Sequence, residues 1–276
     1  MRGHDRIINI YIFQMIDITK IPVYCINLES RPERYVRFLQ QEGIQGLTIE
    51  RVVAVDGSRL QISKNSKISL QTQYNIIHHT RRSHGEINTP GAIGCSLSHY
   101  SIWEKFLQTD QPYCLVLEDD ASIPRGFAES ISKYSKDLDQ LQSRFDVWSL
   151  SYRLYDKRVY PLTPNWNSPV YFWGTSSYIL SRNGAIQLMK DFFPIESHLD
   201  KYMCLKNALG SLKVIVHSSF KTQTLNYGSD IQLYKCHLCD LPDSFEDSVL
   251  VHKYIVYAAC VYGISITLLF ALHTNE

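Results

Sequence analysis

A short apolar run that leads directly into three acids constrains the fold of this chain most. Residues 113–117, YCLVL, have the character of a buried strand, and Glu118, Asp119 and Asp120 follow without a break. Packed carboxylates repel one another, so they need a cation, hydrogen bonds or protons. From the acids alone, a ligand site and a solvated strand end are equally well supported.

The first part of the chain alternates strand and helix signals. Residues 21–28 predict a buried strand and residues 48–57 a second one. Between them we expect a helix to about Gln41, with Ser30 as its N-cap, Pro32 in its first turn and Glu33 completing a capping box. A strand, a helix and a strand in this order begin an α/β fold with parallel strands.

The rest of the chain continues this alternation. Thr89 and Pro90 predict the start of a helix whose small residues allow close approach to another backbone or to a ligand. Later patterns predict helices in 124–141, 182–192 and 199–209, and strands in 145–152, 171–180 and 212–216. Residues 58–88 are polar and aperiodic, and we expect a solvated loop whose histidines, His78, His79 and His84, bind no metal.

Composition limits the function classes. The chain has 276 residues, 45% of them hydrophobic, and a net charge of +1, so we expect a real core and no nucleic acid partner. Seven cysteines lie scattered, several in apolar runs, which favours reduced core thiols over a disulfide framework. We interpret Cys236 and Cys239 as an incidental CxxC, because a zinc site needs about four ligands.

The two ends of the sequence differ in character. Residues 1–20 form an N-terminal extension without a convincing signal peptide, because polar residues interrupt its apolar run. From Tyr254 to Leu272 there is no charged residue, and about 20 apolar residues span a bilayer. We therefore predict a linker over 236–251 and a single-pass transmembrane anchor over 252–273, with a buried core helix as the alternative. Which face of the membrane the chain occupies stays open.

Polar groups follow several predicted strands. Asp56 and Gly57 close the second strand, and Arg31 and Arg34 follow the first. In open α/β sheets, ligands bind beyond the carboxyl ends of the strands. Carboxylate oxygens favour hard ions such as Mg²⁺ and Mn²⁺, and coordination positions left open suit phosphate oxygens. This combination predicts a metal–diphosphate site.

Six segments in order resemble a known family: INLESRPER, AVDG, GAIGCSLSHYSIW, LVLEDD, SSYILSRNGA and HLDKYM. Together they are similar to glycosyltransferase family 25, which includes bacterial lipooligosaccharide galactosyltransferases and the galactosyltransferase domain of animal collagen-modifying enzymes. The resemblance covers about residues 21–231, and we assign a catalytic domain to 21–235. It implies a GT-A-like fold, a Rossmann-like mixed sheet flanked by helices.

The resemblance also implies a reaction and its participants. These are a UDP-sugar donor, with galactose favoured, Mn²⁺ (or Mg²⁺), and inverting transfer to a hydroxyl of a glycan, a lipid-linked glycan or a protein. Asp120 becomes the expected metal ligand with help from Glu118, and Asp200, the late aspartate, the expected catalytic base. The residues expected to bind the donor are Asn27, Arg31, Arg34, Asp56, Gly57, Ser98, His99, Glu118 and Asp119.

Some alternatives stay open. A glycoside hydrolase also uses paired carboxylates, and a member without catalysis would bind glycans only. For His99, a ligand contact and a satisfied core histidine are equally supported, whereas Trp148 is expected in the core. No pattern in 58–88 aligns with the family, and the C-terminal apolar segment lies outside its domain.

Overall fold

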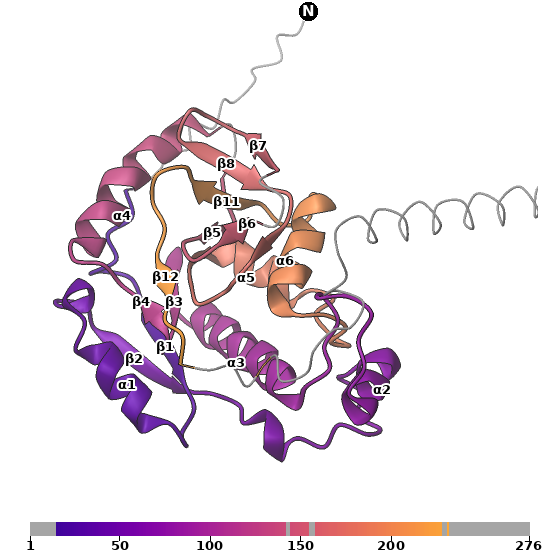
Figure 1. The fold of residues 1–276 in the computed structure, drawn as a ribbon. Coiled ribbons are helices and arrows are strands. Elements are labelled where there is room, and N and C mark those ends of the chain that lie inside the picture. The colour runs from indigo at the N-terminus through magenta and orange to yellow at the C-terminus, as the bar shows by residue number, and fades with distance from the viewer. Residues whose placement is uncertain (1–14, 142–143, 155–157, 228–230, 232–276) are drawn as a thin grey trace, which may run out of the picture.

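The structure is a computed structural model that describes residues 15–141, 144–154, 158–227 and 231. Within these residues an eight-stranded mixed sheet lies between helices (Figure 1). This confirms the predicted α/β class with a mixed sheet. In spatial order the strands are β2 (Ile49–Val53), β1 (Val23–Asn27), β3 (Tyr113–Glu118), β10 (Ser177–Ser181), β5 (Val147–Ser149), β11 (Val214–His217), β8 (Trp166–Pro169) and β7 (Val159–Pro161).

Strand direction decides where the functional groups meet. β1 runs parallel to both β2 and β3, so their carboxyl ends lie at one edge of the sheet. β10 runs antiparallel to β3, with Ser177 opposite Leu117, so residues just before β10 reach the same edge. Two small ribbons add to this side: β4 (Ala121–Ser122) pairs with β12 (Gln223–Thr224), and β6 (Arg153–Leu154) pairs with β9 (Phe172–Trp173).

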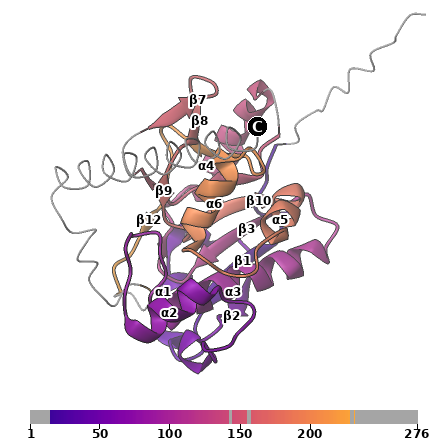
Figure 2. The same ribbon diagram turned by 90° about the vertical axis from the view of Figure 1, so that its right-hand side faces the viewer.

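Helices cover both faces of the sheet. Successive side chains of β3 point to opposite sides and are apolar on both, so each face has to be buried. Cys114 and Val116 belong to one buried cluster, and Leu115 and Leu117 to the other. Figure 2 brings α5 and α6 in front of the sheet. The described helices are α1 (Pro32–Leu39), α2 (Leu70–His78), α3 (Pro90–Leu107), α4 (Phe127–Ser135), α5 (Arg182–Met189) and α6 (Leu199–Ala208), with 3₁₀ turns η1 (Glu42–Ile44), η2 (Gly57–Arg59) and η3 (Lys136–Gln140).

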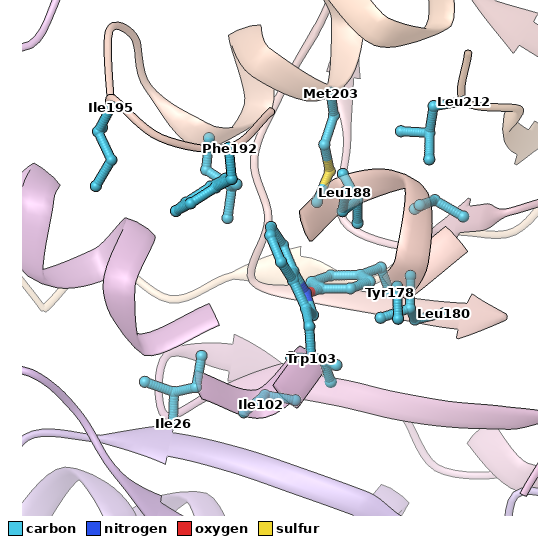
Figure 3. Packing of buried hydrophobic residues seen from close by; sticks show 14 of the residues in the cluster. Ile26, Ile102, Trp103, Tyr178, Leu180, Leu188, Phe192, Ile195, Met203 and Leu212 are labelled. Atoms are coloured by element: carbon cyan, nitrogen blue, oxygen red, sulfur yellow. The ribbon is translucent and has the colours of Figure 1, made fainter. Parts of the chain in front are cut away.

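The core beneath α3 contains a polar pair. Trp103 on α3 and Tyr178 on β10 are both buried, and their side chains lie together in Figure 3. The indole Nε1–H of Trp103 donates a hydrogen bond of 2.9 Å to the Tyr178 hydroxyl. On the opposite face Trp148 is fully buried against Trp166, which confirms its predicted place in the core.

The start of α3 agrees with its sequence signals. The Thr89 hydroxyl accepts the N–H of Ala92, and Pro90 lies in the first turn. The small residues serve backbone packing: a Cβ on Gly94 would lie 2.4 Å from the carbonyl oxygen of Val55, and one on Gly57 would lie 2.1 Å from that of Pro90. Helix α3 therefore approaches the segment after β2 more closely than any side chain would permit.

Two local predictions are wrong. Residues 58–88 are more than a loop, because they contain α2, capped by the Ser69 hydroxyl. The buried face of α2 is largely polar, and the Gln73 amide donates to the carbonyls of Asn65 and Ile68, so the sequence shows no apolar periodicity. Ser30 does not cap α1: the N-cap residue is Arg31, which makes no side-chain cap. A turn from Leu28 to Arg31 precedes the helix.

Other boundaries shift. The strand predicted over 171–180 is divided into β9 and β10 by Gly174, whose φ of +103° interrupts extended backbone. The prediction also missed β6, β7 and β8, which are short and contain polar residues and proline. Ile16 and Ile18, inside the predicted N-terminal extension, are buried in the core.

The structure tests the predictions about the cysteines and the C-terminus only in part. Cys25, Cys95, Cys114 and Cys204 are free thiols, as predicted. Cys236, Cys239, the linker 236–251 and the apolar segment 254–272 lie outside the described residues. Among the residues that the structure does describe, no helix is both long enough and apolar enough to cross a bilayer.

Candidate functional site

A cavity of about 440 Å³, here called the first cavity, opens at the edge where β1, β2 and β3 end. All nine residues expected to bind the donor line it, together with Asp120. They come from the end of β1, the start of α1, the segment after β2, helix α3 and the end of β3. Residues that are far apart in the sequence therefore meet at one edge of the sheet.

A second cavity of about 500 Å³ adjoins the first, and Asp200 lines it. The two cavities share four wall residues, Cys95, Glu118, Asp120 and Ile231. Glu118 and Asp120 thus face both spaces, whereas Asp200 borders only the second. This arrangement suits a reaction between two ligands that meet at the shared carboxylates.

Glu118 ends a buried chain of hydrogen bonds. The Tyr178 hydroxyl lies 2.9 Å from Nδ1 of His99, and Nε2 of His99 lies 3.3 Å from Oε1 of Glu118. Because the Tyr178 oxygen already accepts the indole N–H of Trp103, its own proton is available to His99 Nδ1. Nε2 of His99 then points its proton at Glu118 and donates it to the carboxylate.

Burial alone would raise the pKa of Glu118. Hydrogen bonds from His99 and from the hydroxyl of Thr175, 3.1 Å away, lower it on balance. The pKa of Glu118 is therefore lower than that of an ordinary glutamate, and its carboxylate stays ionised at neutral pH. His99 is fully buried and also lines the first cavity, so it combines both roles left open by the sequence.

Asp119 is held by a second series of hydrogen bonds. Its Oδ2 accepts a hydrogen bond of 2.5 Å from the Asn27 amide. The Asn27 carbonyl oxygen accepts in turn from the Arg51 guanidinium, with Nε at 3.0 Å and Nη2 at 2.5 Å. Burial raises the pKa of Asp119, while Asn27 and the charges of nearby arginines oppose that shift. Arg51, on β2, therefore orients Asn27 and, through it, Asp119.

Replacing Arg51 by methionine should weaken nucleotide binding through loss of this orientation. We expect UDP affinity to fall about tenfold, the order expected for one lost charge-assisted hydrogen bond, and thermal stability to fall as well. Isothermal titration with UDP measures the first effect. Arg125→Met is the control, because its 89% exposed side chain makes only a surface ion pair with Glu42. Unchanged UDP affinity in Arg51→Met would refute the positioning role.

Asp120 differs from its two neighbours in having a buried carboxylate oxygen, Oδ1, without a hydrogen-bond partner among the described residues. Burial and the charges of Glu118 and Asp119 raise its pKa to about 8, although Arg34 acts in the opposite direction. A buried carboxylate oxygen without a proton donor, flanked by two further carboxylates, fits a hard divalent cation. Asp120 therefore fits the predicted metal ligand better than Glu118, whose Oε1 already has two partners.

A softer set of ligand atoms lies nearby. The Cys95 sulfur, a ring nitrogen of His99 and a carboxylate oxygen of Glu118 lie within 4.8 Å of one another. Both ring nitrogens of His99 already have hydrogen-bond partners. Burial raises the pKa of the Cys95 thiol well above its usual range, which disfavours the thiolate a metal requires. This set is less suited to an ion than Asp120 is.

Asp200 lies in the first turn of α6 and faces the second cavity. Its Oδ2 accepts the N–H of Gly174 at 3.0 Å, and its Oδ1 accepts the N–H of Lys201 at 2.8 Å. Burial raises the pKa of Asp200, the two backbone hydrogen bonds lower it, and the charge of Glu118 raises it, with a net upward shift. A fixed carboxylate with a raised pKa has the properties of a general base.

Three predicted donor residues chiefly shape the cavity wall. The Ser98 hydroxyl donates to the carbonyl of Gly94 at 2.6 Å and accepts the N–H of Val55 at 2.8 Å. Asp56 caps η2 by accepting the N–H and hydroxyl of Ser58. Gly57 permits the close contact with α3. All three line the first cavity, and their direct contact with a donor stays a prediction.

A family model described as "Glycosyltransferase family 25 (LPS biosynthesis protein)" matches residues 20–203, more than half of the 276-residue chain. The chain belongs to glycosyltransferase family 25. The matched span contains every predicted site residue from Asn27 to Asp200. This confirms the resemblance seen in the sequence motifs.

Curated relatives agree with this membership. The chain is 29% identical over 189 residues to a glycosyltransferase 25 family member of Anopheles gambiae, covering 64% of the chain and 31% of the relative. It is 31% identical over 176 residues to procollagen galactosyltransferase 2 of Homo sapiens, covering 60% and 27%. The same identity over the same length relates it to "probable inactive glycosyltransferase 25 family member 3" of Rattus norvegicus, covering 60% and 29%. The chain therefore spans less than a third of each relative.

Among solved structures, CMP:2-keto-3-deoxy-manno-octonic acid synthetase complexed with CTP matches with a TM-score of 0.39 and 10% identity. It covers 76% of this chain and 93% of that one. This similarity is too distant to inform the site.

Sequence reasoning missed several residues of this family 25 site. Arg51 belongs to β2, and its role depends on β1 and β2 being neighbours. Thr175 follows the Gly174 turn, and Tyr178 reaches the site only through His99. Tyr227 lies over the Arg34 guanidinium at 5.6 Å, and its carbonyl accepts from Arg34. The family segment SSYILSRNGA, which contains Tyr178, is the one signal in the sequence that points to any of them.

Proposed function

We propose that this family 25 chain is an inverting glycosyltransferase that moves a hexose, galactose by preference, from a UDP-sugar to a hydroxyl acceptor with Mn²⁺ (or Mg²⁺). Family membership and relatives named as galactosyltransferases support the reaction class. The observation that carries the proposal is the buried Oδ1 of Asp120, which follows Glu118 and Asp119, has no partner among the described residues and belongs to the wall shared by two cavities. The mixed sheet with helices on both faces is compatible with a GT-A fold.

The first cavity would hold the nucleotide. Arg31 and Arg34 line it and offer positive charge to a diphosphate. Asp120, with Glu118 beside it, would hold the divalent cation, whose charge, when bound, stabilises the departing UDP. Asn27 and Asp119 form a polar wall at the end of β1. His99 and Thr175 keep Glu118 ionised and fixed in orientation.

The second cavity would hold the acceptor. The Asp200 carboxylate would take the proton of the attacking hydroxyl, while the backbone N–H groups of Gly174 and Lys201 fix its position. The hydroxyl oxygen would then attack the anomeric carbon from the side opposite UDP, which inverts that centre. Two cavities that share Glu118 and Asp120 as wall residues support separate places for donor and acceptor on either side of these carboxylates.

Membrane association is a separate part of the proposal. The uncharged run from Tyr254 to Leu272 supports a C-terminal anchor that would keep the enzyme close to lipid-linked or membrane-bound acceptors. Glycans, lipid-linked glycans and protein hydroxyls are all possible acceptors under this proposal.

A screen of UDP-sugars for slow hydrolysis, with Mn²⁺ or with EDTA, tests the function. We expect UDP release from UDP-galactose that requires the cation. Cation-dependent UDP binding without release would favour a non-catalytic member, as the name of the rat relative suggests for that protein. Neither binding nor release with any UDP-sugar would refute the proposal. Hydrolysis of nitrophenyl galactosides without UDP binding would instead support the glycoside hydrolase alternative.

A further inference from the structure

The second cavity has a wall that the proposed reaction leaves unused. Besides Asp200 and the shared carboxylates, its lining includes His84, Arg153, Trp173 and His198. Trp173 contributes an aromatic surface, with its ring 5.9 Å from that of His84 in an edge-on arrangement. An aromatic wall combined with several polar groups is typical of sites for small polar ligands.

His198 is the least satisfied of these residues. It precedes α6 as its N-cap residue, and its backbone N–H donates to the carbonyl of Gly85 at 3.1 Å. An isolated bridge between Glu86 and Ser197 holds the adjoining backbone. The side chain is only 7% exposed. Nevertheless its Nε2 has no hydrogen-bond partner among the described residues, which is costly for a buried polar atom.

The environment fixes the protonation of His198. Burial and the positive charges of Arg81 and His84 lower its pKa to about 4, although a hydrogen bond to the backbone of Glu86 acts against them. The imidazole is therefore neutral near pH 7. We assign the one ring proton to Nδ1, so that the unpartnered Nε2 carries the lone pair. Nε2 is then a hydrogen-bond acceptor, suited to a hydroxyl and unsuited to an anion.

Groups of both signs line this cavity. Three of its wall residues are the acids Glu118, Asp120 and Asp200, and Arg153 lies in the same lining. A ligand rich in hydroxyls can donate hydrogen bonds to the carboxylates and accept them from the guanidinium without carrying a charge of its own.

We propose that the second cavity binds a sugar acceptor and that Nε2 of His198 accepts a hydrogen bond from one of its non-reacting hydroxyls. This assignment rests on the proposed function and specifies its acceptor side. Trp173 provides the apolar surface along the sugar ring, and Asp200 faces the reacting hydroxyl. A site that hydrogen-bonds a particular hydroxyl discriminates strongly against analogues that lack it.

The experiment measures UDP release from UDP-galactose in the presence of Mn²⁺. A panel of methyl glycosides and free 5-hydroxylysine serve as acceptor probes. We expect at least one methyl glycoside to raise UDP release above hydrolysis. His198→Phe should raise the KM for that glycoside about tenfold, as expected for one lost hydrogen bond, with a smaller effect on kcat. His198→Gln keeps an acceptor oxygen and should restore most of the affinity.

A matched control separates this role from simple burial. His217 on β11 is also buried, also has an unpartnered Nε2 among the described residues and has a pKa lowered by burial, but it borders neither cavity. His217→Phe should leave the glycoside KM unchanged, and UDP affinity is measured in every variant.

The outcomes separate this assignment from the proposed function. If no UDP-sugar is turned over, the function itself fails, and the acceptor assignment fails with it. If hydrolysis occurs but only 5-hydroxylysine, or no probe at all, raises UDP release, the function stands and the sugar assignment is overturned. An unchanged KM in His198→Phe overturns the role of His198, and so does a parallel loss of UDP affinity, which would indicate a structural effect.

Discussion

Asp200→Asn should lower kcat by about 10²- to 10⁴-fold, the usual contribution of a general base. The amide cannot accept the proton of the acceptor hydroxyl, yet its carbonyl oxygen can still accept the N–H of Gly174 or of Lys201. UDP affinity should stay near that of the wild type, because Asp200 borders only the second cavity.

The pH profile provides a second measurement of the same role. Burial and the charge of Glu118 raise the pKa of Asp200 above the ordinary aspartate range. A base must be deprotonated, so kcat/KM of the wild type should rise with pH through this raised pKa. The variant should lose this limb of the profile.

Asp146 provides a matched control for Asp200. It is buried and accepts the backbone N–H of Lys213, but it lies outside both cavities. Asp146→Asn should lower the melting temperature while the folded enzyme keeps its kcat. Wild-type kcat in Asp200→Asn would show that another group is the base.

The second large effect is expected from Asp120→Asn. In Mn²⁺, UDP affinity should fall by at least about 100-fold, because the loss even of outer-shell partners of metal ligands costs about 10- to 100-fold. The residual activity of this variant should be the same with and without EDTA. Titration calorimetry with UDP, with and without Mn²⁺, measures this. Asp191→Asn, at an exposed position with a positive φ that asparagine tolerates, is the control. Retained Mn²⁺-dependent UDP binding would rule out Asp120 as the ligand.

The same variant should behave differently without metal. The pKa of Asp120 is raised from 3.8 in the unfolded chain to about 8 in the fold. Between these values the unfolded chain releases the proton more readily, so this group's contribution to stability is lost as pH rises from about 4 to about 8. In EDTA, Asp120→Asn should therefore melt at a higher temperature than the wild type at pH 8, and at nearly the same temperature at pH 4. Differential scanning calorimetry at both pH values tests this sign.

The sequence predicted the site well wherever strand order alone decided it. Asn27, Asp56 and Glu118 each follow or end a strand, and parallel neighbours bring such residues to one edge whatever the details of packing. The acid cluster was recognised from the apolar strand that runs into it, whereas Asp200 was recognised only because a family motif carries it. The presence of Gly174, Thr175 and Ser176 in the second cavity follows from β10 running antiparallel to β3, which the predicted strand alone does not reveal.

Residues that act through another residue were not predictable. Arg51 reaches Asn27 only because β2 is the neighbour of β1, and Tyr178 reaches Glu118 only through His99. Helix α2 was missed because it buries Thr72, Gln73 and Asn75, whose hydrogen bonds replace an apolar face. In both cases the stabilising contacts join polar atoms, which leave no periodic signal in a sequence.

The segment after β11 determines how much of this chain the candidate site needs. Strand β12 pairs with β4, and the N–H of Leu225 donates to the carbonyl of Asp120 at 2.7 Å. The Thr89 hydroxyl donates to the carbonyl of Ile231, which borders both cavities. The family match ends at residue 203, before any of these contacts. A fragment trimmed to the matched residues would lose β11 from within the sheet and the backbone that supports the acid cluster, so a fragment that keeps the candidate site intact has to include residue 231.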